Sequence, residues 1–204
     1  MNNNSVKTIK VATSYLVAND KVMAQLHKKV GPCTMRLSST YFENLCGSIV
    51  SQQLSSKAAD TIYGRFVELL EKDITPQKVV QFSPERIATV GVSKSKARFI
   101  VGLAEHFIEQ PHFWKTLPKL PNEEAKKQLL TIKGIGNWTA DIFLIFSLFR
   151  LDVFPIGDVG LHNAIQYFYQ LKKKPSENQL LKISKRWGEY SAVASWYLWR
   201  GYDG

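Results

Sequence analysis

The chain has 204 residues, of which 45% are hydrophobic and 12% are aromatic, so it can bury a substantial core and is not of the disordered class. It carries 27 Lys and Arg against 17 Asp and Glu, and this net charge of +10 favours a polyanionic partner such as nucleic acid. The two cysteines, Cys33 and Cys46, fit a reducing compartment and exclude a four-cysteine zinc or iron–sulfur site built from this chain alone.

The N-terminal residues MNNNSVKTIK contain no continuous apolar segment and no small-residue cleavage site, so we expect no secretory signal. The most apolar window, residues 142–151, is interrupted by Ser147 and Arg150 and is about half of the roughly 20 residues that a membrane span needs. We therefore predict a cytoplasmic protein, nucleoid-associated if it is bacterial, in which this window is a buried core helix.

Apolar residues recur at spacings of three and four along the chain, as they do between residues 22 and 30 and between residues 62 and 70. Helix starts are indicated at Ser83-Pro84 and Pro175-Ser176, where a hydroxyl and a proline precede an acidic first turn. No strand-like alternation and no long linker interrupts this pattern. The sequence therefore predicts an all-α chain of about ten helices that folds as one unit.

The stretch from residue 121 to residue 164 is the most informative part of the sequence. Asn122 is placed to cap a helix with an acidic first turn, which then runs until Gly134. The triplet Gly134-Ile135-Gly136 permits a tight turn between two helices, with Ile135 buried between them. Backbone amides near Gly136 would then face outward and suit a DNA phosphate. A Gly-x-Gly pair alone is usually an ordinary helix end.

The context of this pair resembles the helix-hairpin-helix (HhH-GPD) superfamily of DNA glycosylases, most closely the 3-methyladenine DNA glycosylase II branch. Residues 48–55, SIVSQQLS, resemble the loop with which that branch approaches the damaged strand. Gly91-Val92 followed by Lys94 and Lys96 resembles its middle turn, and residues 186–199 resemble its final helix. These matches follow one another in the expected order over residues 40–200.

The resemblance implies an all-α, two-lobed helical fold, with the active cleft between the lobes. The whole chain, residues 1–204, would form a single glycosylase unit. The central lobe would cover residues 54–150, with the helix-hairpin-helix at 122–149. The second lobe would consist of residues 1–53 and 151–204.

The resemblance places the catalytic carboxylate on Asp158. Cleavage of an N-glycosidic bond develops positive charge on the sugar, and an ionised carboxylate stabilises that charge and orients or deprotonates a water molecule. The structural alternative is that Asp158 only caps the helix that begins near Val159. Asp141 is accounted for by the dipole of its helix and Asp152 by ordering of the loop, and neither matches the catalytic position.

Trp138 occupies the position at which bifunctional members of the superfamily carry a lysine that forms a Schiff base. An indole cannot form one, which favours a monofunctional enzyme that uses water. The alternatives are a bifunctional glycosylase/AP lyase for other damaged bases and a non-catalytic helix-hairpin-helix module that only binds DNA. Lys133 precedes the hairpin glycines and is expected to contact a phosphate.

Alkylated purines are cationic, and an electron-rich aromatic pocket attracts them by stacking and cation–π interaction. Trp138 and Trp199 occupy positions that resemble the family's pocket wall and are the predicted substrate-binding residues. Trp196 is a weaker candidate for this wall, and both Trp187 and Trp196 are expected to pack in the core. Ile142 stands where other members carry a tyrosine, so the range of bases is left open.

A base in duplex DNA must be flipped out, and the gap behind it must be filled. The loop at residues 51–54 is the predicted wedge, with Gln53 as the plug, and a polar helix cap is its structural alternative. His162 is expected to be a surface or packing histidine and not a base. We predict double-stranded DNA with damaged bases as the partner, a monomer, and no cofactor or metal. The predicted DNA-binding residues are Gln52, Gln53, Leu54, Lys133, Gly134, Gly136 and Thr139.

Overall fold

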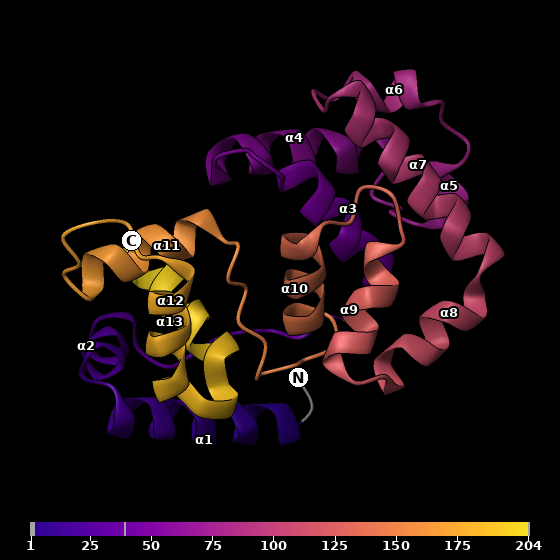
Figure 1. Cartoon of the computed structure of the whole chain (residues 1–204). Helices are drawn as coiled ribbons and strands as arrows, with labels where there is room; N and C mark the ends of the chain where they lie inside the picture. The colour runs from indigo at the N-terminus through magenta and orange to yellow at the C-terminus, as the bar shows by residue number, and fades with distance from the viewer. Residues whose placement is uncertain (1–2, 39, 204) are drawn as a thin grey trace. The chain divides into compact units, whose positions relative to one another are not determined.

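The computed structural model describes residues 3–38 and 40–203, and side chains at 5–38, 40–55 and 57–202. Every regular element within these ranges is a helix, which confirms the all-α prediction. Thirteen α-helices and two 3-10 helices occur in the described residues (Figure 1). They outnumber the expected ten because three of them, α5 (Pro76–Val79), α6 (Pro84–Ala88) and α8 (Pro111–Thr116), span only one or two turns.

The chain divides into two compact units. Unit 1 contains residues 1–37 and 144–204, and unit 2 contains residues 38–143. The first boundary lies at Ser38 and not near residue 54, because α3 (Tyr41–Ser51) packs against α4 (Ser56–Leu69) and α7 (Lys94–Glu109) of unit 2. The second boundary falls between Phe143 and Leu144, earlier than the predicted residue 150.

Unit 1 is built around the C-terminal helix, which packs against helices from both ends of the chain (Figure 1). Its core includes the fully buried rings of Trp187 and Tyr197, and Trp196 is only 8% exposed. The prediction that Trp187 and Trp196 pack in the core is confirmed. The helices of unit 1 are α1 (Asn3–Asn19), α2 (Lys21–Val30), α11 (Val159–Phe168), α12 (Glu177–Ser184), the 3-10 helix η2 (Lys185–Tyr190) and α13 (Ser191–Asp203).

A buried carboxylate connects three segments of unit 1. Asp20 caps α2 by accepting a hydrogen bond from the amide of Val22 at 2.8 Å. Its other oxygen accepts from the Tyr169 hydroxyl at 2.6 Å and from the Trp187 indole at 3.3 Å. Burial and the adjacent Asp20 carboxylate raise the pKa of Tyr169. The buried charge is therefore compensated by several donors, as a buried charge requires.

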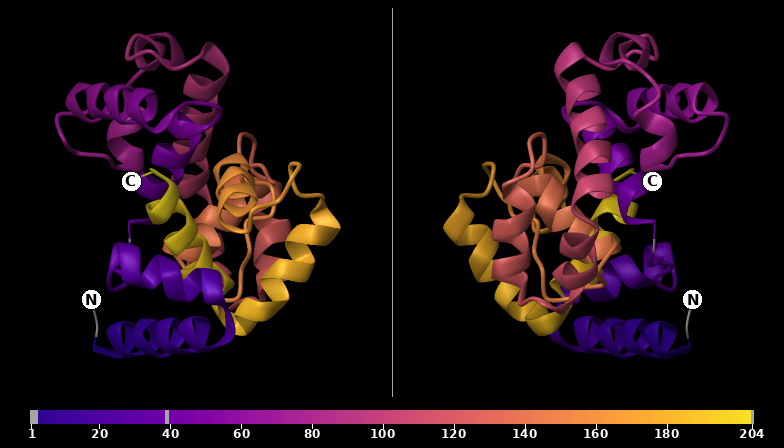
Figure 2. Two further views of the ribbon diagram at one scale, coloured as in Figure 1. Left: turned by 90° about the vertical axis from the view of Figure 1, so that its left-hand side faces the viewer. Right: turned by 90° about the vertical axis from the view of Figure 1, so that its right-hand side faces the viewer.

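Unit 2 is centred on α7, which packs against α3, α5 and α6 (Figure 2). Leu45, Phe66 and Ile100 are completely buried in its core, so the apolar spacing predicted around residues 62–70 marks the inner face of α4. Ser83 caps α6 as expected, by accepting from the amide of Arg86 at 3.2 Å. The remaining helices are the 3-10 helix η1 (Leu117–Lys119), α9 (Asn122–Leu130) and α10 (Asn137–Phe146), which runs across the unit boundary.

The apolar window at residues 142–151 is only partly helical. Helix α10 ends at Phe146, and Phe149 adopts a positive φ of 57° that no α-helix accommodates. The prediction of a helix over the whole window is therefore wrong in its second half, although Leu151 is buried. Among the described residues, no helix combines the length and apolar character needed to cross a membrane.

Candidate active site

The segment between α10 and α11, residues 147–158, carries the predicted catalytic aspartate and is anchored to the core of unit 1. We call it the catalytic loop, after the role that the sequence predicts for Asp158. The carbonyl of Leu151 accepts a hydrogen bond from the amide of Ala192 at 2.9 Å. The ring of Phe154 packs edge-on against Trp187, with centroids 5.4 Å apart. These two contacts fix the backbone of the loop ahead of Asp158.

Asp158 ends this loop at the N-cap of α11, where its side chain is half-buried. The carboxylate oxygen Oδ1 accepts two hydrogen bonds, one from the amide of Leu161 at 2.6 Å and one from the indole of Trp199 at 3.0 Å. A Cβ on Gly160 would lie 3.3 Å from the same oxygen, so the glycine leaves space for the pair. The aspartate does cap the helix, and it is also held by a donor from α13.

His162 supports the last turn of the catalytic loop. Its Nε2 lies 2.5 Å from the carbonyl oxygen of Ile156, and because a carbonyl only accepts, Nε2 carries the proton. The imidazole therefore stabilises the loop through this hydrogen bond. Of the two competing carboxylates, Asp152 is exposed, and Asp141 lies in unit 2.

Helices α9 and α10 flank the predicted hairpin, and its two glycines differ. Gly134 has a φ of +91°, and a Cβ built there would lie 2.5 Å from the ring of Phe99, so only glycine fits. Ile135 is 5% exposed, as predicted. Gly136 is exposed, and a Cβ there would meet no atom within 4 Å. The turn therefore accepts only glycine at position 134, whereas the surface around Gly136 is open to another molecule.

Two details of the hairpin differ from expectation. Pro121, and not Asn122, occupies the cap position of α9, and Asn122 is the first helical residue, because proline suits a position that needs no amide donor. Asp141 does not merely face the dipole of α10, because Lys126 of α9 donates to it at 2.6 Å. Burial raises the pKa of Asp141 and Lys126 opposes that rise, so the ion pair joins the two helices.

The predicted wedge, residues 51–54, begins at the last residue of α3, and we call the segment after this helix, residues 52–55, the wedge loop. The side-chain amide of Gln52 donates to the carbonyl of Gly134 at 2.9 Å and to the hydroxyl of Thr139 at 3.0 Å. Thr139 is 1% exposed, so its hydroxyl is used within unit 2, and its assignment as a DNA-binding residue stays a prediction. The amide of Gln52 is likewise used within unit 2. Gln53 and Leu54 are exposed.

The remaining predicted residues lie at the surface or close to it. Lys133 is exposed beside the hairpin, and Trp138 is half-buried in the first turn of α10. Trp199 is half-buried on α13 and packs against Phe146, with ring centroids 6.2 Å apart. Both tryptophans therefore keep part of their aromatic surface accessible.

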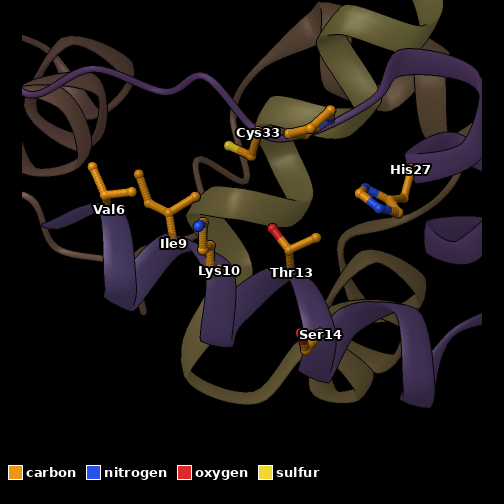
Figure 3. Close-up of a pocket in the computed structure, with 8 residues that line it drawn as sticks. Val6, Ile9, Lys10, Thr13, Ser14, His27 and Cys33 are labelled. Carbon is orange, nitrogen blue, oxygen red and sulfur yellow. The ribbon is translucent and has the colours of Figure 1, made fainter.

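A pocket of about 480 Å³ in unit 1 includes none of the predicted site residues (Figure 3). Helix α1 supplies most of its wall, and His27 of α2 faces it. Across the described side chains, no three His, Cys, Asp or Glu groups lie close enough to bind one metal ion. The pocket is lined by Val6, Ile9, Lys10, Thr13, Ser14, His27, Pro32 and Cys33.

Residues 46–189, which include the hairpin and the catalytic loop, match the HhH-GPD superfamily of base excision DNA repair proteins. The chain belongs to this superfamily. It is 32% identical to the alkylbase DNA glycosidase-like protein of Schizosaccharomyces pombe, over 94% of this chain and 92% of that one. DNA-3-methyladenine glycosylase 1 of the same organism is 33% identical, over 96% of this chain and 88% of its own length.

The fold is shared with a solved member of the superfamily. The structure of a Schizosaccharomyces pombe 3-methyladenine DNA glycosylase in complex with abasic DNA superposes with a TM-score of 0.81 at 33% identity, covering 92% of this chain and 94% of that chain. The superfamily resemblance and the all-α glycosylase fold predicted from the sequence are therefore confirmed.

Three contacts at the site were not predicted from the sequence. The indole of Trp199 reaches Asp158, the ammonium of Lys126 reaches Asp141, and the ammonium of Lys96 reaches the end of α3. Each joins residues from separate helices, and no local spacing encodes such a pairing. The sequence did place Lys96 in a turn with a family resemblance, but it assigned no role to the side chain.

Proposed function

We propose that the protein is a monofunctional DNA glycosylase that hydrolyses the N-glycosidic bond of alkylated bases, 3-methyladenine and related alkylpurines, in base excision repair. The observation that carries the proposal is the carboxylate of Asp158, which ends an anchored loop and accepts hydrogen bonds from Leu161 and Trp199. The relatives named as alkylbase and 3-methyladenine glycosylases support the substrate class.

Asp158 acts on the sugar and not on the base. As the glycosidic bond breaks, positive charge develops on the sugar ring, and a fixed carboxylate stabilises that charge without having to reorganise. The carboxylate also orients the water molecule that completes the hydrolysis. An alkylated purine is already cationic and therefore departs without a strong acid. One oriented carboxylate is sufficient for this reaction.

Trp138 and Trp199 contribute to selection of the base. Each is half-buried and presents an aromatic face that attracts a cationic ring by stacking and cation–π interaction. The indole of Trp138 has no amine that could form a Schiff base with the sugar. Water is therefore the nucleophile, and the product is an abasic site. Trp199 has a second role, because its N–H orients Asp158.

The hairpin binds the DNA backbone. The first amides of α10 have no acceptor within their own helix, and the open surface at Gly136 leaves room for a phosphate beside them. Lys133 lies on the exposed surface of the same turn. With a net charge of +10, affinity for undamaged duplex falls steeply as salt concentration rises.

The test is to incubate the purified protein with methylated duplex DNA and to identify the released bases by chromatography and mass spectrometry. We expect free 3-methyladenine and an equal amount of abasic sites, with no enzyme–DNA adduct after borohydride reduction. An adduct would instead identify a bifunctional lyase. DNA binding without base release would identify a non-catalytic helix-hairpin-helix module.

A further inference from the structure

The wedge loop contains a strained residue at the position predicted to fill the gap in the duplex. Gln53 adopts a φ of 57°, in the left-handed region that non-glycine residues rarely occupy. Such a conformation costs on the order of 1–3 kcal/mol and persists only where surrounding contacts enforce it. The side chain of Gln53 is exposed. The enforcing contacts must therefore come from the backbone and from neighbouring residues.

The first of these contacts comes from Lys96, in the first turn of α7. Its ammonium donates to the carbonyl of Val50 at 2.9 Å and to the carbonyl of Gln52 at 2.6 Å. These carbonyls lie at the C-terminal end of α3, where the backbone acceptors lack helical partners and the dipole favours a cation. Lys96 thus fixes the backbone immediately before Gln53.

The second contact is the side chain of Gln52 itself. Its amide bridges the carbonyl of Gly134 in the hairpin turn and the hydroxyl of Thr139 in α10. The backbone of Gln52 is thus held by Lys96, and its side chain is held by the hairpin. The segment that would grip the phosphates and the segment that would enter the duplex are connected through this one residue.

We propose that Lys96 and Gln52 are positioning residues that hold the wedge loop ready to displace a paired base, and that Gln52 couples this loop to the hairpin. The inference rests on the proposed glycosylase function. Displacing a base from a fully paired duplex requires a rigid plug, since a mobile loop would lose conformational entropy on insertion. A mispaired base is already partly released and needs the plug less.

The experiment compares two duplexes that carry the same alkylated base, one opposite its normal partner and one opposite a mismatched base. Lys96→Met removes the ammonium but keeps an extended side chain. We expect its single-turnover release rate to fall about tenfold or more on the paired duplex and less than about threefold on the mispaired one. Lys96→Arg can still donate to both carbonyls and restores the paired rate.

Lys94→Met is the matched control, because Lys94 is exposed in the same turn of α7 and the change removes an identical charge. It leaves the ratio of the two rates at the wild-type value. Gln52→Met is the second variant, because it keeps the Lys96 contacts and deletes only the bridge to the hairpin. We expect it to depress the paired rate selectively as well.

Equal losses on both duplexes, or no loss on either, would overturn the proposal, since a merely structural defect does not distinguish paired from mispaired substrates. Melting temperatures of all variants identify any that fail to fold, and Gln52→Met then carries the decision. Absence of base release by the wild-type protein on either duplex would instead contradict the proposed function itself.

Discussion

The catalytic loop of unit 1 and the wedge loop of unit 2 are stabilised in different ways. Aromatic packing and main-chain bonds anchor the catalytic loop, and its aspartate accepts from an amide and an indole. The wedge loop is exposed and is held by the polar side chains of Lys96 and Gln52. In the proposed function, the catalytic loop stabilises charge and gains from a rigid apolar support, whereas the wedge loop contacts DNA and must stay at the surface. The two functions should therefore be separable by mutation.

The largest expected effect is on the catalytic loop. Asp158→Asn keeps the cap of α11, since asparagine caps as well as aspartate, but removes the charge. We expect base release to fall about 10³-fold, or about 4 kcal/mol, with the melting temperature and duplex Kd unchanged. Single-turnover release from methylated duplex measures this. Asp152→Asn, at an exposed site of the same loop, is the control.

Near wild-type release by Asp158→Asn would mean that this residue serves only as a helix cap. The difference in function between the catalytic loop and the wedge loop would then not hold, and another carboxylate would have to stabilise the charge on the sugar.

The second prediction concerns the support of the hairpin in unit 2. Lys126→Met leaves the buried carboxylate of Asp141 without its ion-pair partner. We expect a loss of about 3 kcal/mol in the free energy of unfolding at neutral pH, because an uncompensated buried charge is costly. Urea denaturation measures it. Lys127→Met, exposed at the next position, should change stability by less than about 0.5 kcal/mol.

The pH dependence of that loss sharpens the test. Burial raises the pKa of Asp141, and Lys126 opposes the rise. Without Lys126, the folded state binds a proton at this carboxyl more readily than the unfolded state does, so stability increases as the pH falls through the folded pKa. The gap between Lys126→Met and the wild type should therefore narrow in acid. A gap that stays constant with pH would contradict the ion-pair explanation.

The third prediction separates the two roles of Trp199. Trp199→Phe keeps an aromatic face but removes the N–H that donates to Asp158. We expect release of every alkylated base to fall by a similar factor, about tenfold, because one hydrogen bond to a charged group contributes about 1.5 kcal/mol. In Trp199→Ala, the release of bases should fall further, and it should fall most for cationic bases. Tyr202→Phe, exposed on the same helix, is the control. A change in the affinity of Trp199→Phe for duplex DNA would instead assign Trp199 to the DNA-binding surface.

The smallest effect is expected at the hairpin glycines. Gly136→Val meets no atom of the protein and should leave the melting temperature unchanged. It should weaken binding to damaged and undamaged duplex alike by about tenfold, because a bulky side chain keeps the phosphate from the backbone. Filter binding at two salt concentrations measures this. Gly134→Ala is the counterpart. Its main effect should be to lower the free energy of unfolding, because its Cβ would overlap the ring of Phe99. A changed base preference in Gly136→Val would contradict the proposal that the hairpin only binds the DNA backbone and that base release occurs at a separate site.

The sequence predicted the helix content and the hairpin because these depend on local signals. The assignment of the catalytic carboxylate to Asp158 rests on the same kind of signal and stays a prediction. Glycines, apolar spacing and a carboxylate after a helix are visible in one stretch of chain. The contact between the Thr139 hydroxyl and Gln52 was not predicted, because a position at the start of a helix does not reveal it. The ends of α10 and of the units were also missed, because the packing of α3 against α7 and the turn at Phe149 depend on tertiary contacts.

The partners of the charged groups were likewise beyond sequence analysis. The pairing of Lys126 with Asp141 spans two helices, and that of Lys96 with Val50 and Gln52 spans two turns far apart in the chain. A lysine on a helix surface gives the same sequence signal whether it meets solvent, a carboxylate or a carbonyl. Only the packing of the helices decides among these environments.

The division of the chain into a continuous and a discontinuous unit has a consequence for biosynthesis. Unit 2 is one uninterrupted segment, so its contacts are all available once residue 143 has emerged from the ribosome. Unit 1 joins residues 1–37 to residues 144–204, and closing so long an intervening loop is slow and entropically costly when that segment is unfolded. Prior folding of unit 2 shortens the distance to be closed. The helices that carry the hairpin should therefore acquire protease resistance on nascent chains before the segment that bears Asp158 does.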